Sequence, residues 1–221
     1  MYVPDIHSLP LRTTTAVTSD HVFVDDGDLQ VGIWEAAPGE QLGSTDDYDE
    51  VMFMVGGRTT VRHDGGTFDL VPGALWSTPR SWRGDWYVHQ TVRKMYVIDH
   101  RPGGAASPEY LSNAYSADLG AATPRPVVLA GDPRERSVTV SAHNRLEAGV
   151  WDCTPGSFPF RRDGYDEVFC VLAGHATLSF DSGLVVDLRP GSVLLTPSGS
   201  TGRWDVHDTV RKAYVMIHER P

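Results

Sequence analysis

Two copies of one sequence pattern fill most of this chain of 221 residues, and this duplication limits the folds that the chain can adopt. Residues 88–94 (VHQTVRK) recur as residues 206–212 (VHDTVRK), and the segment YDEV also occurs twice. The offset between the copies is 117 residues up to Asp64 and 118 residues beyond it. Of the 72 positions from 29 to 100, 31 are identical in the second copy. The sequence therefore predicts two domains with the same fold.

Within each copy, short β-prone runs alternate with Gly, Pro and Asp. Examples are residues 51–55, 59–63 and 168–172, which are rich in Val, Phe, Thr and Leu. Gly and Pro together make up about one residue in six, which is typical of short strands joined by many turns. Neither copy contains a convincing stretch of helical periodicity. We therefore expect an all-β protein with two tandem barrels or sandwiches.

The connection between the copies differs in character from the copies themselves. We expect an N-terminal domain at 1–102, a linker at 103–136 and a C-terminal domain at 137–221. A Ser-Pro-Glu segment that begins at Ser107 resembles a helix start, and apolar residues follow at four-residue spacing up to Leu119. The linker is therefore predicted to contain one short helix.

Charge and composition exclude several classes of protein. The formal net charge is −10, and no Lys/Arg cluster reverses it locally, so nucleic-acid binding is not expected. We expect no signal peptide and no membrane span, because no apolar run approaches 18 residues. Cys153 and Cys170 have no metal or redox spacing and are predicted to be buried free thiols. A cytoplasmic protein is the expectation.

The conserved spacing within the two copies resembles the two signature motifs of the cupin superfamily. Each copy has a Glu that is followed after six residues by a Gly, and then a Pro-Gly and a Thr-Pro. The end of each copy, Trp followed by Thr-Val-Arg-Lys-x-Tyr-Val, is similar to the subgroup of the ethanolamine-utilisation cupin and ureidoglycine aminohydrolase. This resemblance implies a jelly-roll barrel, or double-stranded β-helix, in each copy. It also implies a site at the barrel mouth.

Typical cupins hold a divalent metal through three His and one Glu, a ligand set that suits Mn, Fe, Ni or Zn. Carried over by position, the ligands fall on Ser44, Asp46, Glu50 and Gly84 in the first copy and on Arg161, Asp163, Glu167 and Gly202 in the second. All three imidazoles are missing from both sets. We therefore expect no metal of the usual family kind and no other cofactor.

Both copies retain a different set of polar residues. Strand alternation places Lys94 and Tyr96 on one face, and Lys212 and Tyr214 on the corresponding face of the second copy. The resemblance implies that this face points into the barrel. In the C-terminal copy the predicted catalytic residues are Glu167, Lys212 and Tyr214, and the predicted substrate-binding residues are Arg161, Asp163, Trp204 and His218. In the N-terminal copy the predicted second pocket consists of Asp46, Glu50, Trp86, Lys94, Tyr96 and His100.

The leading hypothesis is a bicupin that binds a small anionic metabolite in a metal-independent pocket and transforms it by proton transfer, as a lyase, isomerase, cyclase or hydrolase. The C-terminal copy is favoured because its lip has small residues and carries Arg161 and Arg162. The Lys–Glu pair fits a purely structural ion pair equally well. A non-catalytic binding or scaffold bicupin and a metal-dependent, aminohydrolase-like cupin remain alternatives. A homodimer is expected by analogy.

Overall fold

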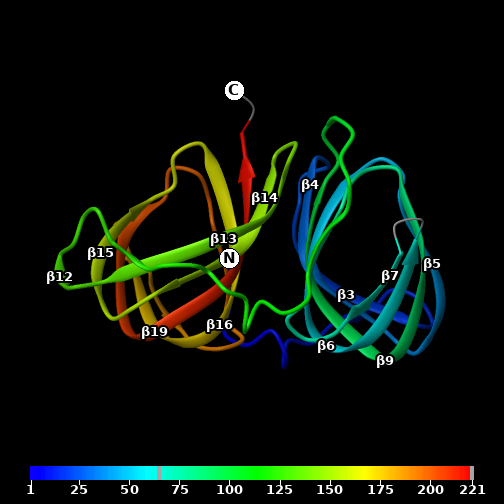
Figure 1. Cartoon of the computed structure of the whole chain (residues 1–221), viewed down its shortest axis with the longest axis horizontal. Helices are drawn as coiled ribbons and strands as arrows, with labels where there is room; N and C mark the ends of the chain where they lie inside the picture. Colours follow the sequence, from blue (N-terminus) through cyan, green and yellow to red (C-terminus); the bar gives the residue numbers. More distant parts are fainter. Residues whose placement is uncertain (64–65, 220–221) are drawn as a thin grey trace. The chain divides into compact units, whose positions relative to one another are not determined.

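The computed structural model describes residues 1–63 and 66–219. The chain forms two compact units. We call the unit of residues 7–114 and 141–146 the N-terminal barrel, and the unit of residues 1–6, 115–140 and 147–221 the C-terminal barrel. The described residues contain strands and no helix, so the all-β prediction is confirmed (Figure 1). None of their segments is a helix long and apolar enough to span a membrane.

The nine strands of the N-terminal barrel form one sheet, in the order β10-β8-β6-β9-β4-β3-β2, with β5 paired to β9 and β7 paired to β6. These strands are β2 (Arg12–Thr13), β3 (Thr18–Asp25), β4 (Leu29–Ala36), β5 (Gly39–Thr45), β6 (Asp49–His63), β7 (Gly66–Leu70), β8 (Leu75–Thr78), β9 (Trp82–Asp99) and β10 (Glu109–Leu111).

The second sheet has ten strands in the order β1-β18-β16-β19-β14-β13-β11, with β15 joining β12 to β19 and β17 paired to β16. These strands are β1 (Tyr2–Val3), β11 (Thr123–Pro124), β12 (Ala130–Gly131), β13 (Arg134–His143), β14 (Leu146–Cys153), β15 (Gly156–Arg161), β16 (Tyr165–Phe180), β17 (Val185–Leu188), β18 (Val193–Thr196) and β19 (Thr201–His218).

One long strand of each repeat, β6 in the first and β16 in the second, contains a bulge with a glycine. The pairing of β6 with β9 shifts register around Gly57, and the pairing of β16 with β19 shifts around Gly174. Both glycines have positive φ, +77° and +83°. A Cβ atom at either would overlap the backbone carbonyl of Thr91 or Thr209 across the sheet. Only glycine allows this close approach, and the bulge bends the strand as closure of a barrel requires.

The linker does not form the predicted helix. Residues Glu109–Leu111 instead form β10 and pair with β8, where Tyr110 lies opposite Trp76 with ring centroids 5.5 Å apart. A helix of about a dozen residues is marginally stable by itself, whereas the edge of β8 offers unpaired backbone groups and an apolar surface. The prediction was wrong because tertiary pairing outweighed the local helix signal.

The C-terminal barrel receives an equivalent edge strand from the start of the chain. Strand β1 pairs with β18, and the Tyr2 hydroxyl donates to the carbonyl of Asp187, as the Tyr110 hydroxyl donates to Asp69 in the N-terminal barrel. The amide of Ile6, which is fully buried, donates to the carbonyl of Gly191. Residues 1–6 are therefore an integral part of the C-terminal barrel.

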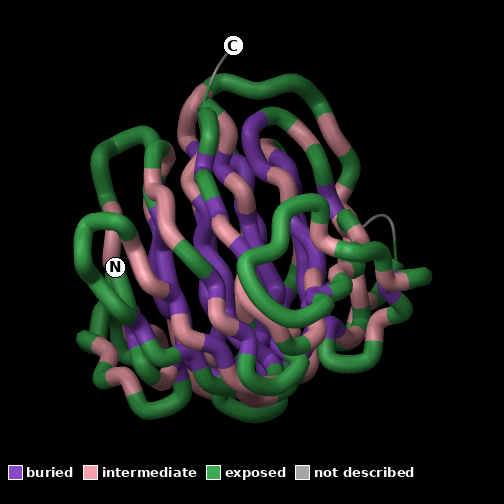
Figure 2. Tube along the Cα trace, turned by 90° about the vertical axis from the view of Figure 1, so that its left-hand side faces the viewer, coloured by how far each residue is buried: buried purple, intermediate pink, exposed green. Residues whose placement is uncertain are grey.

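Burial is continuous in the central strands, such as β8 and β18, and alternates in parts of others, such as β15 and β17. Buried residues lie along the strands and exposed residues in the connecting loops (Figure 2). The inward residues of β14, β15, β16, β18 and β19 form one apolar cluster of the C-terminal barrel. Cys153 and Cys170 are buried and free, which confirms their prediction, and burial raises both thiol pKa values to about 12.

Candidate functional site

Each barrel contains one cavity that is lined by the repeated polar residues. The cavity volumes are about 350 Å³ in the N-terminal barrel and about 280 Å³ in the C-terminal barrel. The C-terminal cavity is lined by Arg125, Ser137, Thr139, Glu147, Trp151, Phe158, Phe160, Arg162, Glu167, Trp204, Lys212, Tyr214 and Met216. The N-terminal cavity is lined by Asp20, Gln30, Trp34, Gln41, Gly43, Ser44, Thr45, Tyr48, Glu50, Met52, Trp82, Trp86, Lys94, Tyr96 and Ile98.

A buried ion pair forms part of the wall of the C-terminal cavity. Lys212 Nζ on β19 donates to Oε1 of Glu167 on the neighbouring strand β16 at 2.6 Å, and both side chains are buried. The ammonium group also lies 4.4 Å from the ring centroid of Phe169 and 5.1 Å from that of Trp151. Such cation–π contacts and the ion pair together offset the cost of burying the charge.

Arg162 binds the second oxygen of the same carboxylate. Its Nη2 donates to Glu167 Oε2, and its Nε donates to the hydroxyl of Thr196 at 3.1 Å. Thr196 in turn donates to the backbone carbonyl of Glu167 at 3.2 Å, and it lies opposite Glu167 in the pairing of β16 with β18. Glu167 therefore has a cation on each of its two oxygens.

This arrangement determines which group can exchange protons near neutral pH. Burial alone would raise the pKa of Glu167, but the charges of Lys212 and Arg162 outweigh burial and lower it, so this carboxyl stays ionised. Burial lowers the pKa of Lys212 to about 8, with the Arg162 charge acting in the same direction and Glu167 opposing them. Lys212 is therefore the better candidate for an acid or base, and Glu167 is a weak base.

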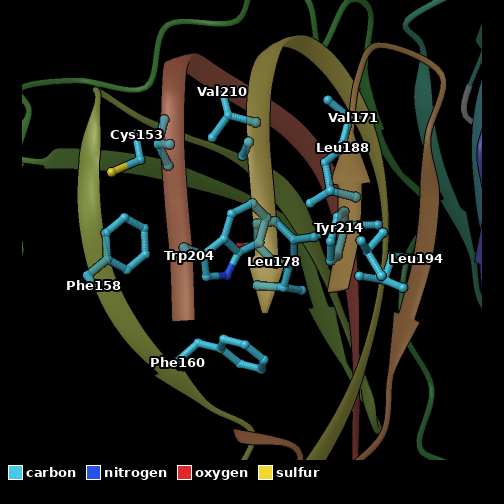
Figure 3. Close-up of a cluster of buried hydrophobic side chains, with 14 residues drawn as sticks. Cys153, Phe158, Phe160, Val171, Leu178, Leu188, Leu194, Trp204, Val210 and Tyr214 are labelled. Atoms are coloured by element: carbon cyan, nitrogen blue, oxygen red, sulfur yellow. The ribbon is translucent and has the colours of Figure 1, made fainter. Parts of the chain in front are cut away.

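Aromatic rings and a second carboxylate complete the cavity. Phe158, Phe160, Trp204 and Tyr214 point into the interior of the C-terminal barrel (Figure 3), and the Phe158 and Trp204 rings stack with centroids 6.4 Å apart. The Tyr214 hydroxyl donates to Glu147 at 3.3 Å. Burial and the Glu147 charge raise the pKa of Tyr214 to about 12, so its hydroxyl remains a hydrogen-bond donor.

Three residues that the sequence analysis placed at this cavity lie outside its lining. Arg161 and Asp163 form a surface ion pair, and 70% of the Arg161 side chain is exposed against 9% for Arg162. His218 lies near Glu147, with 3.8 Å between Nε2 and Oε2, and is half exposed outside the lining. The structure therefore brings Glu167, Lys212, Tyr214 and Trp204 together, and their functional roles remain predictions.

Of the two adjacent arginines, Arg162 lines this cavity and Arg161 faces solvent. Phe158 and Phe160 follow the period of two that buries alternate residues of β15, and Arg162, the residue after this strand, is also buried. Trp151, which the sequence did not single out as a site residue, lines the cavity beside Lys212. Arg125 comes from the linker, where no repeat signal identified it.

The N-terminal cavity repeats the ion pair without the arginine. Lys94 Nζ donates to Glu50 Oε1 at 2.6 Å and lies 5.0 Å from the Trp34 ring centroid and 5.5 Å from that of Trp86. The Tyr96 hydroxyl donates to the side-chain oxygen of Gln30 at 3.2 Å. Burial raises the pKa of Tyr96 above its usual range. Four of the six predicted residues of this pocket therefore line the cavity.

The remaining two predicted residues of that pocket lie outside the lining. Asp46 is exposed and forms an ion pair with Arg83, and His100 is half exposed, with 4.0 Å between its Nδ1 and Oδ2 of Asp47. Asp46 follows the end of β5, and His100 follows the end of β9. Beyond a strand end, alternation no longer fixes which way a side chain points, so the period of two did not extend to these positions.

Lysine occurs only twice in the whole sequence, at positions 94 and 212, whereas arginine occurs seventeen times. Both lysines are buried in the cavities and paired with the equivalent glutamates. Unlike arginine, a buried lysine readily shifts its pKa toward neutrality. The sequence by itself shows that the two lysines stand at equivalent positions of the two repeats, and this is the signal that marks them as site residues.

The sequence matches the EutQ-like cupin domain family twice, at residues 24–96 and at residues 140–214. The chain therefore belongs to this family and is a bicupin, since each repeat is a complete cupin domain. A search of curated proteins finds no match to the sequence.

Solved structures share the fold at low sequence identity. A protein of unknown function from Pseudomonas syringae pv. tomato superposes with a TM-score of 0.73 and 21% identity, over 90% of this chain and 85% of that chain. Ylba from E. coli has a TM-score of 0.70 and 10% identity, over 100% of this chain and 91% of that chain. Salicylate 1,2-dioxygenase from Pseudaminobacter salicylatoxidans has a TM-score of 0.66 and 11% identity, over 90% of this chain and 76% of that chain. These likenesses establish the fold.

The residues of these barrels do not fit the divalent metal that typical cupins hold. Both oxygens of Glu167 accept hydrogen bonds from cationic side chains, so a metal ion there would meet two positive charges within bonding distance. Across residues 1–63 and 66–219, no three His, Cys, Asp or Glu side chains gather in a way that could hold a metal ion. We therefore derive no chemistry through a metal.

Proposed function

We propose that the C-terminal barrel binds a small anionic metabolite and transforms it by proton transfer, with Lys212 as the acid or base. The observation that carries this proposal is the pairing of one buried carboxylate, Glu167, with two cations, Lys212 and Arg162, in the wall of a cavity. Arg125 adds a third cation to the lining, against the two carboxylates of Glu147 and Glu167. Among the lining residues cations therefore outnumber carboxylates, while Glu135, which is not a lining residue, pairs with Arg125 from outside.

The geometry supports a division of roles. Arg162 and Arg125 would hold the anion, while Glu167 keeps Lys212 and Arg162 in place. Lys212, with a pKa of about 8, is present in both protonation states near neutral pH and can therefore give or take a proton. The Tyr214 hydroxyl can donate to a developing oxyanion. Of the three catalytic residues expected from the sequence, this scheme gives the proton transfer to Lys212 and a positioning role to Glu167.

The adjacent residues Arg162 and Arg161 provide a matched pair of variants with which to test anion binding. We expect small carboxylates or phosphate to bind the purified chain in isothermal titration calorimetry, with malonate, succinate and inorganic phosphate as first probes. Arg162→Thr copies Thr45 of the N-terminal barrel and should weaken binding by about tenfold or more. Arg161→Thr removes the same charge from the surface and should leave the affinity within about twofold. Equal losses in both variants, or no binding by the wild type, would contradict the proposal.

Turnover separates catalysis from binding. Any anion that binds is then incubated with wild type and Lys212→Met, and its conversion is followed by NMR. If the wild type converts the ligand and Lys212→Met does not, the result supports an enzyme in which Lys212 takes part. A ligand that stays intact favours the non-catalytic alternative, which the buried Lys–Glu ion pair also supports. The cytoplasmic location, the homodimer and a closer kinship with ureidoglycine aminohydrolase remain predictions from the sequence.

A further inference from the structure

The two barrels differ at one position beside the equivalent glutamates. In the C-terminal barrel, the guanidinium of Arg162 occupies a site formed by Glu167 Oε2 and the Thr196 hydroxyl. The N-terminal repeat keeps the glutamate, as Glu50, and the threonine, as Thr78, and these two residues lie opposite each other in the pairing of β6 with β8. The residue equivalent to Arg162 is Thr45.

Thr45 does not take over the role of the arginine. Its hydroxyl donates to the backbone carbonyl of Pro79 at 2.5 Å and accepts from the amide of Trp82 at 3.2 Å, so it is directed away from the carboxylate. In the part of the chain that the structure describes, the hydroxyl of Thr78 is fully buried and has no hydrogen-bond partner. Within the same residues, Glu50 bonds only to Lys94, through Oε1.

An unpartnered buried hydroxyl is costly, and its position identifies the group that would satisfy it. The equivalent hydroxyl in the other barrel accepts from a guanidinium Nε, and the equivalent carboxylate oxygen accepts from the Nη2 of the same group. The N-terminal barrel therefore contains both acceptors of a guanidinium site and lacks the guanidinium.

The adjoining cavity has room for an external group. Gly43 stands where the C-terminal barrel has Phe160, and Glu50, Thr45 and Tyr48 line the cavity. Its lining carries the carboxylates of Asp20 and Glu50 and a single cation, Lys94. This charge balance is the reverse of that in the C-terminal cavity and favours a positively charged ligand.

We propose that the N-terminal cavity binds a small molecule with a guanidinium group, which takes the place that the Arg162 side chain takes in the C-terminal barrel. The planar group would donate to Glu50 and Thr78 together, which a single-point ammonium does less well. Glu50 would then have a cation on each oxygen, as Glu167 has. This site is separate from the proposed function, because it lies in the other barrel and selects the opposite charge.

The test uses methylguanidinium chloride and agmatine against the full-length chain, in calorimetry at constant ionic strength. We expect methylguanidinium to bind at one site, and methylammonium to bind with an affinity at least about tenfold lower. Thr45→Arg supplies the missing guanidinium from the chain and should abolish methylguanidinium binding while keeping the barrel folded. Glu50→Gln should weaken binding by about tenfold or more. In Glu50→Gln the buried Lys94 loses its partner, so circular dichroism checks that this variant folds. If Glu50→Gln does not fold, Thr45→Arg decides the test.

Asp46→Asn is the matched control, because it removes a carboxylate from the same barrel at an exposed position outside the cavity. It should leave the affinity within about twofold. Three results would overturn the inference: no binding of methylguanidinium by the wild type, unchanged binding by Thr45→Arg, or equal losses in Asp46→Asn and Glu50→Gln. Equal affinity for methylammonium would overturn the choice of a guanidinium. None of these outcomes affects the anion test on Arg162.

Discussion

Lys212 and Glu167 form a buried ion pair with 2.6 Å between Nζ and Oε1, and Lys94 and Glu50 form the same pair at the same distance in the other repeat. The two pairs differ in the further hydrogen bonds that the glutamate accepts. Arg162 also bonds to Glu167, whereas the equivalent residue of the N-terminal barrel, Thr45, makes no bond to Glu50. Two pairs with equal geometry should therefore respond differently to the same substitution.

We predict that Lys94→Met destabilises the protein more than Lys212→Met. Loss of Lys94 leaves Glu50 as an uncompensated buried charge, which costs about 3–5 kcal/mol. Loss of Lys212 leaves Glu167 bonded to Arg162, and a methionine fits the ring-lined space, so the cost should stay below about 2 kcal/mol. Urea denaturation followed by tryptophan fluorescence measures both free energies of unfolding. Equal costs would show that Arg162 gives no such support.

Lys212 should titrate near pH 8. The chain has two lysines, so ¹³C-labelling of lysine gives two side-chain signals, and Lys212→Arg identifies the signal of this residue. We expect that signal to shift with a midpoint near the pKa of about 8, because burial disfavours the ammonium form. A midpoint above pH 10 would remove Lys212 as a proton-transfer group at neutral pH.

The same pKa shift predicts a pH dependence of stability. The pKa of lysine in the unfolded chain is about 10.4, so between pH 8 and that value the unfolded state binds more protons than the folded state. The contribution of Lys212 to the free energy of unfolding should therefore rise with pH in this window and be constant below it. The difference between wild type and Lys212→Met, measured by denaturation at several pH values, isolates this contribution. A falling difference would contradict the assignment.

Residues 1–6 should contribute to stability as core residues do. Ile6 is 0% exposed in the C-terminal barrel, so Ile6→Ala should lower the free energy of unfolding by about 2–4 kcal/mol. Val17 is 47% exposed, and Val17→Ala serves as the control, with an expected change within about 0.5 kcal/mol. If Ile6→Ala has as small an effect as the control, the N-terminal segment does not pack on the barrel as described.

Gly174 should tolerate alanine less well than a glycine with similar backbone conformation. Gly174 has φ +83° and faces the carbonyl of Thr209, whereas Gly183 has φ +92° and open space around it. Gly183→Ala should cost about 1–2 kcal/mol from the left-handed conformation alone. Gly174→Ala adds a backbone overlap and should cost clearly more, measured by thermal denaturation. Similar costs would indicate that the bulge relaxes around the new methyl group.

The internal repeat and its period-two pattern determined much of this protein from the sequence. They predicted two all-β domains, and they placed Lys94 with Tyr96, and Lys212 with Tyr214, on one strand face, because alternation within one strand is a local property. The cupin resemblance implied that these faces point inward, and all four residues line the cavities. The same period buries Phe158 and Phe160 in β15, but Arg162 follows the end of that strand, so its place in the cavity was decided by the tertiary structure.

Only the tertiary structure decided the rest. That residues 1–6 complete the C-terminal barrel, and that Glu109–Leu111 form a strand and not a helix, depends on edges supplied by distant segments. The surroundings of the two glutamates likewise arise where strands far apart in the sequence converge: Lys212 lies 45 residues from Glu167, and within residues 1–63 and 66–219 the Thr78 hydroxyl beside Glu50 has no hydrogen-bond partner. Periodicity within a strand carries no information about such contacts between strands.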